Sequence, residues 1–307
     1  MAPRIAYLGP PGTFTEQALR TQDDLLHPEP LPLDSIPDVL WAVADGDVEL
    51  GFVPIENAIE GSVNVTLDSL AFDTDLLIQR EVVMEVTLHL LGLPGTVLGD
   101  VTQVVSIPVA LAQCRNFLRK NLPDATTLPA NSTAEAARML GESGEATQAA
   151  IAPARAGELY GLTVIAAEVE DHPENKTRFV VVAREGVAAA TGHDKTSLVI
   201  YQRRDAPGSL LAILQEFAAR SINLTKLESR PTKQGLGDYC FLVDFEGHID
   251  NEVVADCLRE LKMTQGEVKF LGSYPADGDG AGQARRETAQ AYQQAEAWVR
   301  SIRRQVR

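Results

Sequence analysis

The first 185 residues alternate short apolar runs with stretches in which apolar residues recur at helical spacing. Runs rich in Val, Ile and Leu predict strands, and the stretches between them predict amphipathic helices. The predicted strands cover residues 4–8, 32–34, 50–55, 103–106, 126–128, 149–152, 163–166 and 177–184. The predicted helices cover residues 15–20, 36–45, 64–71, 109–121 and 133–142. This alternation is typical of an α/β protein whose helices cover a largely parallel sheet.

One long apolar run interrupts the alternation. Residues 81–93 (EVVMEVTLHLLGL) predict an extended segment that crosses from one lobe to another, and the strand at 177–184 returns. We therefore expect lobe 1 at about 3–80 and 176–185, and lobe 2 at about 81–175. Two lobes joined by crossing strands leave a cleft between them, which is a common place for a small-molecule site.

The second half of the chain has a different order of elements. Residues 186–195 are small and unpatterned at their start (GVAAATGHD) and predict a linker. Residues 196–274 then follow a β-α-β-β-α-β order, which predicts a ferredoxin-like domain. Its elements are expected at 196–202, 209–220, 223–230, 237–245, 251–261 and 267–274. Residues 275–307 predict a tail that is Gly-rich at first, then partly helical.

Charge and composition narrow the class of protein. The net charge of −16, with no stripe of Lys and Arg before the C-terminal end, argues against a nucleic-acid partner. The N-terminus lacks a signal-peptide pattern, and no run of 18 apolar residues occurs, so we expect a cytoplasmic protein without a membrane span. Three widely spaced cysteines predict free thiols, and five scattered histidines without an HExxH pattern predict no metal site.

Two polar segments follow predicted strands in the first lobe. Residues 9–13 (GPPGT) open a helix, where free backbone N–H groups could hold a carboxylate or phosphate, although a tight turn explains the same residues. Glu56 and Asn57 follow the apolar strand at 50–55, at the end of the sheet where α/β proteins bind ligands. Capping of the next helix is the alternative for this pair.

Further polar residues occur at the ends of later strands. Ser106 and Ser132 each precede a predicted helix, so each is either an N-cap or a ligand contact, and for Ser106 the N-cap is the stronger prediction. Arg178 stands at the start of a buried strand, where it either clamps a carboxylate or forms a structural ion pair. The residue pattern alone leaves these alternatives open.

Taken together, the motifs resemble those of the prephenate dehydratase family, followed by an ACT domain. The resemblance covers almost the whole chain, and the joint order of the pieces makes it specific. The catalytic pieces are YLGPPGTFTEQAL at 7–19, GFVPIENAIEGSVNVTLDSL at 51–70, NSTAEAA at 131–137 and NKTRFVVV at 175–182. The regulatory pieces are PGSLLAIL at 207–214 and INLTKLESRP at 222–231.

The resemblance implies a fold and a reaction. The fold would be a bilobed catalytic domain at 3–185, similar to periplasmic binding proteins, plus an ACT domain at 196–274. The reaction would remove carbon dioxide and the ring hydroxyl from prephenate to give phenylpyruvate in L-phenylalanine biosynthesis. The departing hydroxide then needs a proton donor close to the ring oxygen, and no cofactor or metal is required.

The resemblance also assigns residues to this chemistry. Thr177 would be the essential hydrogen-bond donor of the Thr-Arg-Phe motif, and Arg178 would anchor a substrate carboxylate. Glu56 is a second candidate for the general acid. The full catalytic set is Thr177, Arg178, Phe179, Glu56 and Asn57, and the substrate-binding set is Thr13, Ser106, Gln113 and Ser132. The family commonly has Ser-His-Pro-Gln in the second-lobe loop, whereas this chain has Ser-Ile-Pro-Val at 106–109.

For the ACT domain, the resemblance implies feedback by L-phenylalanine and pairing between subunits as a homodimer or homotetramer. The matching effector residues are Gly208, Ser209, Leu210, Asn223, Glu228, Ser229, Arg230 and Pro231. Two alternatives stay open for the whole chain: arogenate dehydratase, and a bilobed ligand sensor without catalysis. The presence of both Thr177 and Arg178 disfavours the sensor. The sign of regulation is likewise left open.

Overall fold

A computed structural model describes residues 3–202, 206–233, 238–277, 297–299, 301, 303 and 304. The chain divides into two compact units, which we describe separately. Unit 1 consists of Met1–Ser69 and Val82–Val181, and unit 2 consists of Leu70–Glu81 and Val182–Arg307. Most of the predicted tail at 275–307 lies outside the described residues.

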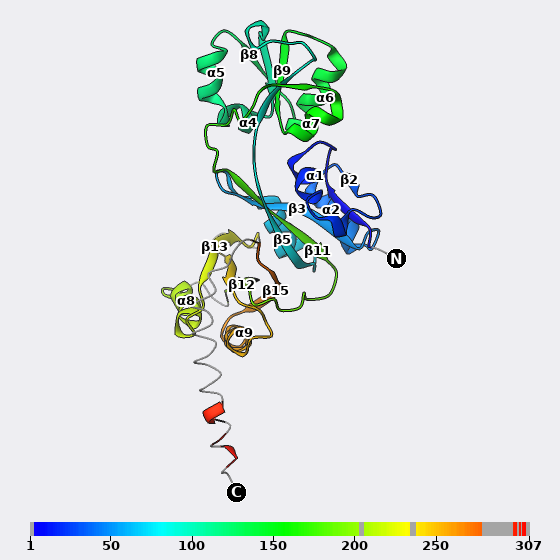
Figure 1. The fold of residues 1–307 in the computed structure, drawn as a ribbon. Coiled ribbons are helices and arrows are strands. Elements are labelled where there is room, and N and C mark those ends of the chain that lie inside the picture. The colour runs from blue at the N-terminus through cyan, green and yellow to red at the C-terminus, as the bar shows by residue number, and fades with distance from the viewer. Residues whose placement is uncertain are drawn as a thin grey trace. The chain divides into compact units, whose positions relative to one another are not determined.

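The first sheet has the strand order β2-β1-β3-β11-β5, with the short β4 paired to β3. Figure 1 labels β2, β3, β5 and β11 of this sheet. Its strands are β1 (Ile5–Leu8), β2 (Leu31–Leu33), β3 (Leu50–Asn57), β4 (Gly61–Ser62), β5 (Leu77–Glu85) and β11 (Lys176–Ala183). Strand β1 runs parallel to both β2 and β3, as the βαβ alternation predicts. The helical elements before β5 are α1 (Phe14–Leu19), η1 (Asp23–Leu25), α2 (Ile36–Ala44), α3 (Asn64–Asp68) and η2 (Ser69–Asp73).

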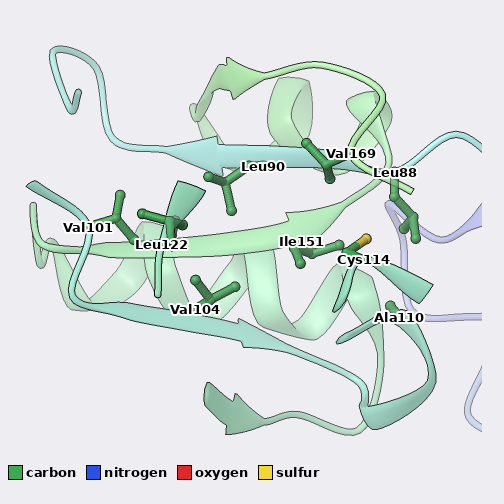
Figure 2. Close-up of a cluster of buried hydrophobic side chains, with 10 residues drawn as sticks. Leu88, Leu90, Val101, Val104, Ala110, Cys114, Leu122, Ile151 and Val169 are labelled. Atoms are coloured by element: carbon green, nitrogen blue, oxygen red, sulfur yellow. The ribbon is translucent and has the colours of Figure 1, made fainter. Parts of the chain in front are cut away.

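The second sheet has the order β10-β6-β9-β7-β8 and is mixed. Strand β7 is parallel to β8 and β9, whereas β6 is antiparallel to β9 and β10. The strands are β6 (His89–Gly92), β7 (Gln103–Ser106), β8 (Thr126–Pro129), β9 (Gln148–Ala152) and β10 (Thr163–Ala166). The helices are η3 (Leu98–Asp100), α4 (Pro108–Gln113), α5 (Arg115–Asn121), α6 (Thr133–Ser143) and α7 (Ala154–Tyr160). Figure 2 shows Leu90, Val104 and Ile151 of three of these strands within one buried cluster.

Two predicted elements of the catalytic region are divided in the structure. The apolar run at 81–93 is not one strand: β5 ends at Glu85, β6 begins at His89, and the two belong to different sheets. The predicted helix at 109–121 breaks at the buried Cys114 into α4 and α5. An apolar run predicts which residues are buried, but it does not predict where the chain moves to another sheet or where a helix axis changes direction.

The third sheet lies in unit 2 and has the antiparallel order β13-β14-β12-β15. The strands are β12 (Asp194–Tyr201), β13 (Leu224–Pro231), β14 (Tyr239–Glu246) and β15 (Glu267–Pro275), and the helices are α8 (Ser209–Ala219) and α9 (Glu252–Thr264). Buried residues of both helices, such as Ile213 and Cys257, share a core with Leu198 and Val243. The predicted ferredoxin-like order is confirmed.

Unit 2 also contains residues Leu70–Glu81, which we call the anchor segment. The Lys269 ammonium donates to the Thr74 carbonyl at 2.6 Å, and the Tyr201 hydroxyl donates to the Ala71 carbonyl at 2.6 Å. Side chains of the third sheet therefore satisfy backbone groups of a segment that lies more than 100 positions earlier in the chain.

The anchor segment ends in a buried ion pair and passes close to a glycine. The Glu81 side chain is 0% exposed, and its carboxylate accepts from Lys195 Nζ at 2.8 and 3.1 Å. Gly272 has a φ of +132°, and a Cβ there would lie 2.4 Å from the Ile78 carbonyl oxygen. Only glycine permits both this backbone conformation and this close approach.

Candidate functional site

Thr177 is the second residue of β11, and Asn57 is the last residue of β3. The two strands are neighbours in the first sheet, so their ends lie together although the residues are 120 positions apart. The Thr177 residue is only 9% exposed. The sequence motifs at 51–70 and 175–182 therefore meet at one end of this sheet.

The Asn57 amide has a fixed orientation. Its oxygen accepts from the backbone N–H groups of Ile59 and Glu60, each at 2.9 Å. Its NH₂ group donates to Asn175 Oδ1 and to Thr177 Oγ1, both at 2.9 Å. Backbone N–H groups only donate, so they determine which side of the amide faces Thr177. The Thr177 oxygen is thus an acceptor here, and its hydroxyl proton is left to point at another acceptor.

The contacts of Asn175 continue to the second lobe. Asn175 Nδ2 donates to Gln113 Oε1 at 3.4 Å, and Gln113 Nε2 donates to Glu60 Oε1 at 3.2 Å. Gln113 is the last residue of α4, whereas Glu60 follows β3. We call Asn57, Gln113, Asn175 and Thr177 the amide cluster. It joins the two lobes by hydrogen bonds.

Arg178 follows Thr177 in β11 and pairs with Glu56 of β3. Its Nη1 lies 3.5 Å from Glu56 Oε2, a longer separation than in a close charge-assisted hydrogen bond. The Arg178 side chain is buried, and that of Glu56 is partly exposed. A planar guanidinium in a buried position suits bidentate binding of a carboxylate.

Phe179 and Ser106 have roles that differ from the predicted ones. The Phe179 ring is buried and stacks on Phe52, with centroids 5.4 Å apart, so it packs in the core of the first lobe. The Ser106 hydroxyl is fully buried and donates to the Ile151 carbonyl at 2.7 Å, which links β7 to β9. The predicted N-cap at Ser106 is wrong, because Ile107 occupies that position. A buried hydroxyl can form its hydrogen bond with a carbonyl of a neighbouring strand, and the sequence does not show which carbonyl lies nearby.

Thr13 and Ser132 are both N-caps. Thr13 Oγ1 accepts from the Glu16 N–H and donates to the Leu8 carbonyl, each at 3.3 Å. Ser132 Oγ accepts from the Glu135 N–H at 3.0 Å, as the motif at this helix start predicts. Both hydroxyls are therefore engaged in local structure, and neither joins the amide cluster.

A second polar contact joins the lobes at Glu16, which the sequence reasoning missed. The Glu16 carboxylate accepts from Gly12 N at 2.5 Å, from Arg20 Nε at 2.6 Å and from Arg155 Nη2 at 3.5 Å. Burial alone would raise the pKa of Glu16, but the Gly12 hydrogen bond and the Arg20 charge outweigh it, so the pKa is lowered. The sequence did contain a signal for this contact, because Glu16 is an acidic residue among the apolar residues of α1. Its partner Arg155 lies 139 positions away.

The predicted effector residues lie on two elements of unit 2. Gly208 is the N-cap of α8 with a φ of +87°, and the following Ser209 accepts from Gln202 Nε2 at 2.8 Å. Leu210 contacts the core cluster of this domain. The Asn223 carbonyl accepts from Glu246 N at 3.0 Å, immediately before β13.

The remaining effector residues alternate along β13. Glu228 and Arg230 are half-buried, with Arg230 Nη1 3.9 Å from Glu228 Oε1, and Ser229 and Pro231 are exposed. Strand β13 is an edge strand of its sheet, so its outer backbone groups face away from β14. This geometry makes β13 available to a ligand or to a second chain.

Across the residues that the structure describes, no group of three or more His, Cys, Asp and Glu side chains is arranged to hold a metal ion. Among the helices of those same residues, none is long and apolar enough to span a membrane. The three cysteines are free and buried, and burial raises the pKa of Cys114 and of Cys257 to about 12.

Comparison with known proteins gives two family matches. Residues 5–187 match the model of the family described as prephenate dehydratase, and residues 196–262 match the ACT domain. The prephenate dehydratase of Mycolicibacterium vanbaalenii is 45% identical over 296 residues, which cover 92% of this chain and 94% of that protein.

Two solved structures are similar over most of the chain. One is prephenate dehydratase from Arthrobacter aurescens in complex with L-Phe, with a TM-score of 0.89 and 38% identity, covering 98% of this chain and 99% of that one. The other is a quorum-quenching acylase, with a TM-score of 0.80 and 32% identity, covering 89% of this chain and 98% of that one.

Proposed function

The chain belongs to the prephenate dehydratase family and carries an ACT domain, and from this premise we propose that it converts prephenate to phenylpyruvate through the amide cluster and Arg178. The observation that carries the proposal is the Thr177 hydroxyl. Its oxygen accepts from Asn57, so its proton is directed at another acceptor, and the next residue of β11 carries a buried guanidinium. A hydrogen-bond donor and an anchor for a carboxylate are the two groups that this elimination requires.

The proposed reaction balances without a cofactor. The bond between the ring and one carboxyl breaks, carbon dioxide leaves, and the electron pair moves into the ring. The ring then expels its hydroxyl group, which takes up a proton and leaves as water, and the product ring is aromatic. Thr177 donates a hydrogen bond to the departing oxygen, because a threonine hydroxyl is too weak an acid to be the final proton source.

Arg178 and Glu56 have complementary roles in this proposal. A carboxylate of the substrate competes with Glu56 for Arg178, whose present contact with Glu56 is 3.5 Å long. Binding of the substrate would then weaken the contact between Arg178 and Glu56. The Glu56 side chain is 37% exposed, so it is accessible to water. Glu56 is thus our candidate for the final proton source.

For regulation, we propose that L-phenylalanine binds the ACT domain at the loop that contains Gly208 and at β13. The Arthrobacter aurescens relative, which is similar over nearly its whole length, is a complex with L-Phe. We further propose pairing of ACT domains in a homodimer or homotetramer, because β13 is an edge strand. The proposed domain bounds are 3–185 and 196–274, joined by a linker at 186–195.

We propose a cytoplasmic location for the protein. Cys114, Cys240 and Cys257 are free and buried, which fits a reducing compartment.

The activity is tested with purified protein and prephenate, by following phenylpyruvate formation with and without L-phenylalanine. Activity of the wild type that is lost in Thr177→Ala is the expected result. Absence of product from the wild type would overturn the proposed function, and full activity of Thr177→Ala would overturn the role of Thr177. Arogenate is offered in parallel, and faster turnover of arogenate would change the assigned substrate. An acylase assay on the same preparation tests the activity named for the second structural neighbour.

A further inference from the structure

We propose that Asn175 is a positioning residue for Thr177, and that Glu60 holds Asn175 in place through Gln113 of the other lobe. The inference rests on the proposed dehydratase function and adds two residues to it. Neither Asn175 nor Glu60 needs to touch the substrate in this role. Each would act by orienting the next polar group, ending at the hydroxyl that faces the departing oxygen.

The direction of every hydrogen bond in this chain of groups is fixed by its two ends. At one end, the backbone N–H groups of Ile59 and Glu60 can only donate, so the Asn57 oxygen must face them. At the other end, an ionised Glu60 carboxylate is an acceptor and never a donor, so the Gln113 NH₂ group must face it. Between these ends, each amide oxygen meets the NH₂ group of its neighbour.

Asn175 is the central link of the cluster. It is 1% exposed, its oxygen accepts from Asn57, and its NH₂ group donates to Gln113. Removing the Asn175 amide takes one of the two acceptors from the Asn57 NH₂ group. The Asn57 oxygen stays on the two backbone N–H groups, but the NH₂ group loses the contact that fixes its position beside Thr177, so the Thr177 hydroxyl is held less tightly. The chemistry would be slowed although the substrate anchor at Arg178 is untouched.

The backbone of Asn175 is held separately from its side chain. Its N–H donates to the His172 carbonyl at 3.2 Å, and its carbonyl accepts from the Val86 N–H at 2.8 Å. These bonds survive a change of side chain. A variant at this position therefore reports on the amide rather than on the path of the chain.

The outer link of the cluster is weaker than its centre. The bond from Gln113 to Glu60 is at the surface, where water competes for both groups. It crosses between the lobes, so it forms only when the two lobes are in contact at this point. Thr177 would thus be fully oriented only in that state, and the weak outer bond lets the lobes separate to admit the substrate.

The decisive experiment compares kcat and KM of four variants in the full-length enzyme. We expect Asn175→Ala to lower kcat at least tenfold and to change KM less than threefold. We expect Glu60→Ala to lower kcat about threefold and Glu60→Gln to restore it, since a glutamine oxygen still accepts from Gln113. Asn121→Ala is the matched control: Asn121 is an exposed asparagine whose amide donates to the Phe117 carbonyl within its own helix, and its variant should behave as wild type.

The activity of Asn175→Asp as a function of pH is a further test. A purely structural role of Asn175 would not make this activity depend on pH in the expected way. An ionised aspartate cannot donate to Gln113, whereas its protonated form donates to Gln113 and accepts from Asn57. We therefore expect the activity of Asn175→Asp, relative to wild type, to rise as the pH falls, while the ratio for Asn175→Ala stays flat. If Asn175→Ala does not fold, this pH profile and the comparison of Glu60→Ala with Glu60→Gln still test the inference.

Three results would overturn the inference. These are wild-type kcat in Asn175→Ala, equal activities of Glu60→Ala and Glu60→Gln, or a flat relative pH profile for Asn175→Asp. A wild type that does not turn over prephenate is a different failure, because it removes the proposed function itself and the inference with it. The wild-type assay therefore separates the two cases.

Discussion

The amide cluster and the anchor segment are both built from buried polar groups, but with opposite chemistry. The cluster consists of neutral amides and a hydroxyl, joined by hydrogen bonds of 2.9–3.4 Å. The anchor segment is held by two lysines and a tyrosine, one lysine pairing with the segment's own Glu81 carboxylate, with contacts of 2.6–3.1 Å. Charged groups at short range hold one arrangement firmly, because breaking a buried pair leaves a charge without a partner.

Because of this difference, we expect the amide cluster to rearrange more easily than the anchor segment. A neutral amide can exchange one partner for another, or for a substrate, at little cost in free energy. The amide cluster is therefore suited to a site that must open and close. The anchor segment is suited to holding Leu70–Glu81 in one place against the third sheet. Four changes test this contrast, from the largest expected effect to the smallest.

The largest effect is expected at Thr177. Thr177→Ala removes the hydroxyl that we propose as donor to the departing oxygen, and we expect kcat to fall by about 10²–10⁴, the usual range for a positioned proton donor. Thr177→Ser keeps a hydroxyl that can accept from Asn57 and should retain most of the activity. Steady-state kinetics with prephenate measure both. A serine variant as inactive as the alanine variant would mean that the methyl group, and not the hydroxyl, is what matters.

The anchor segment should be sensitive in stability rather than in chemistry. Glu81→Ala leaves Lys195 without its carboxylate, and we expect the free energy of unfolding to fall by about 3 kcal/mol, as for a buried pair that loses one partner. Urea denaturation measures this. Glu85→Ala is the control, since Glu85 pairs with Lys176 at the surface at 3.3 Å and should cost less than about 1 kcal/mol. Equal costs would show that burial does not strengthen the anchor.

Arg178 is the residue after Thr177 in β11, and its test concerns binding. Arg178→Lys keeps the positive charge but loses the planar fork that grips a carboxylate. We expect KM for prephenate to rise about tenfold, which corresponds to about 1.4 kcal/mol, with a smaller change in kcat. An unchanged KM would indicate that Arg178 is a structural partner of Glu56 and does not bind the substrate.

The smallest effect is a pH dependence at Glu16. Its pKa is lowered in the folded protein, so its contribution to stability is present above the unfolded value of about 4.3 and is lost as the pH falls through the folded value. Between about pH 5 and pH 3, the wild type should lose more stability than Glu16→Gln, which has no proton to bind. Urea midpoints across this range check it. Glu158→Gln, at an exposed position, should follow the wild type.

The sequence predicted most of the fold because helical and strand periodicities are local properties. Strand β7 and helix α6 lie within one residue of their predicted bounds. The break between β5 and β6 was missed, because both strands are apolar and the change of sheet has no local signal. Helix α7 was missed as well, since it has only seven residues and includes Gly157.

The candidate site could be predicted only in part. The motif resemblance pointed to Asn57 and Thr177, which the structure joins by a hydrogen bond. The roles of Asn175 and Glu60 depend on Gln113, which lies 62 and 53 positions away from them. Such pairings follow from the tertiary fold and not from spacing. Phe179 belongs to the motif, but its ring stacks on Phe52. A residue can therefore be part of a sequence motif because of its packing and not because of its chemistry.

The close approach of Gly272 to Ile78 bears on how this protein can be dissected into parts. A fragment that ended at residue 185 would match the catalytic family almost completely. It would nevertheless lose Lys195, Tyr201 and Lys269, and with them the donors to Glu81, Ala71 and Thr74. We expect such a fragment to be prone to aggregation. Residues 70–81 belong by sequence to one domain and by packing to the other, so a catalytic fragment would need a redesigned surface at this segment.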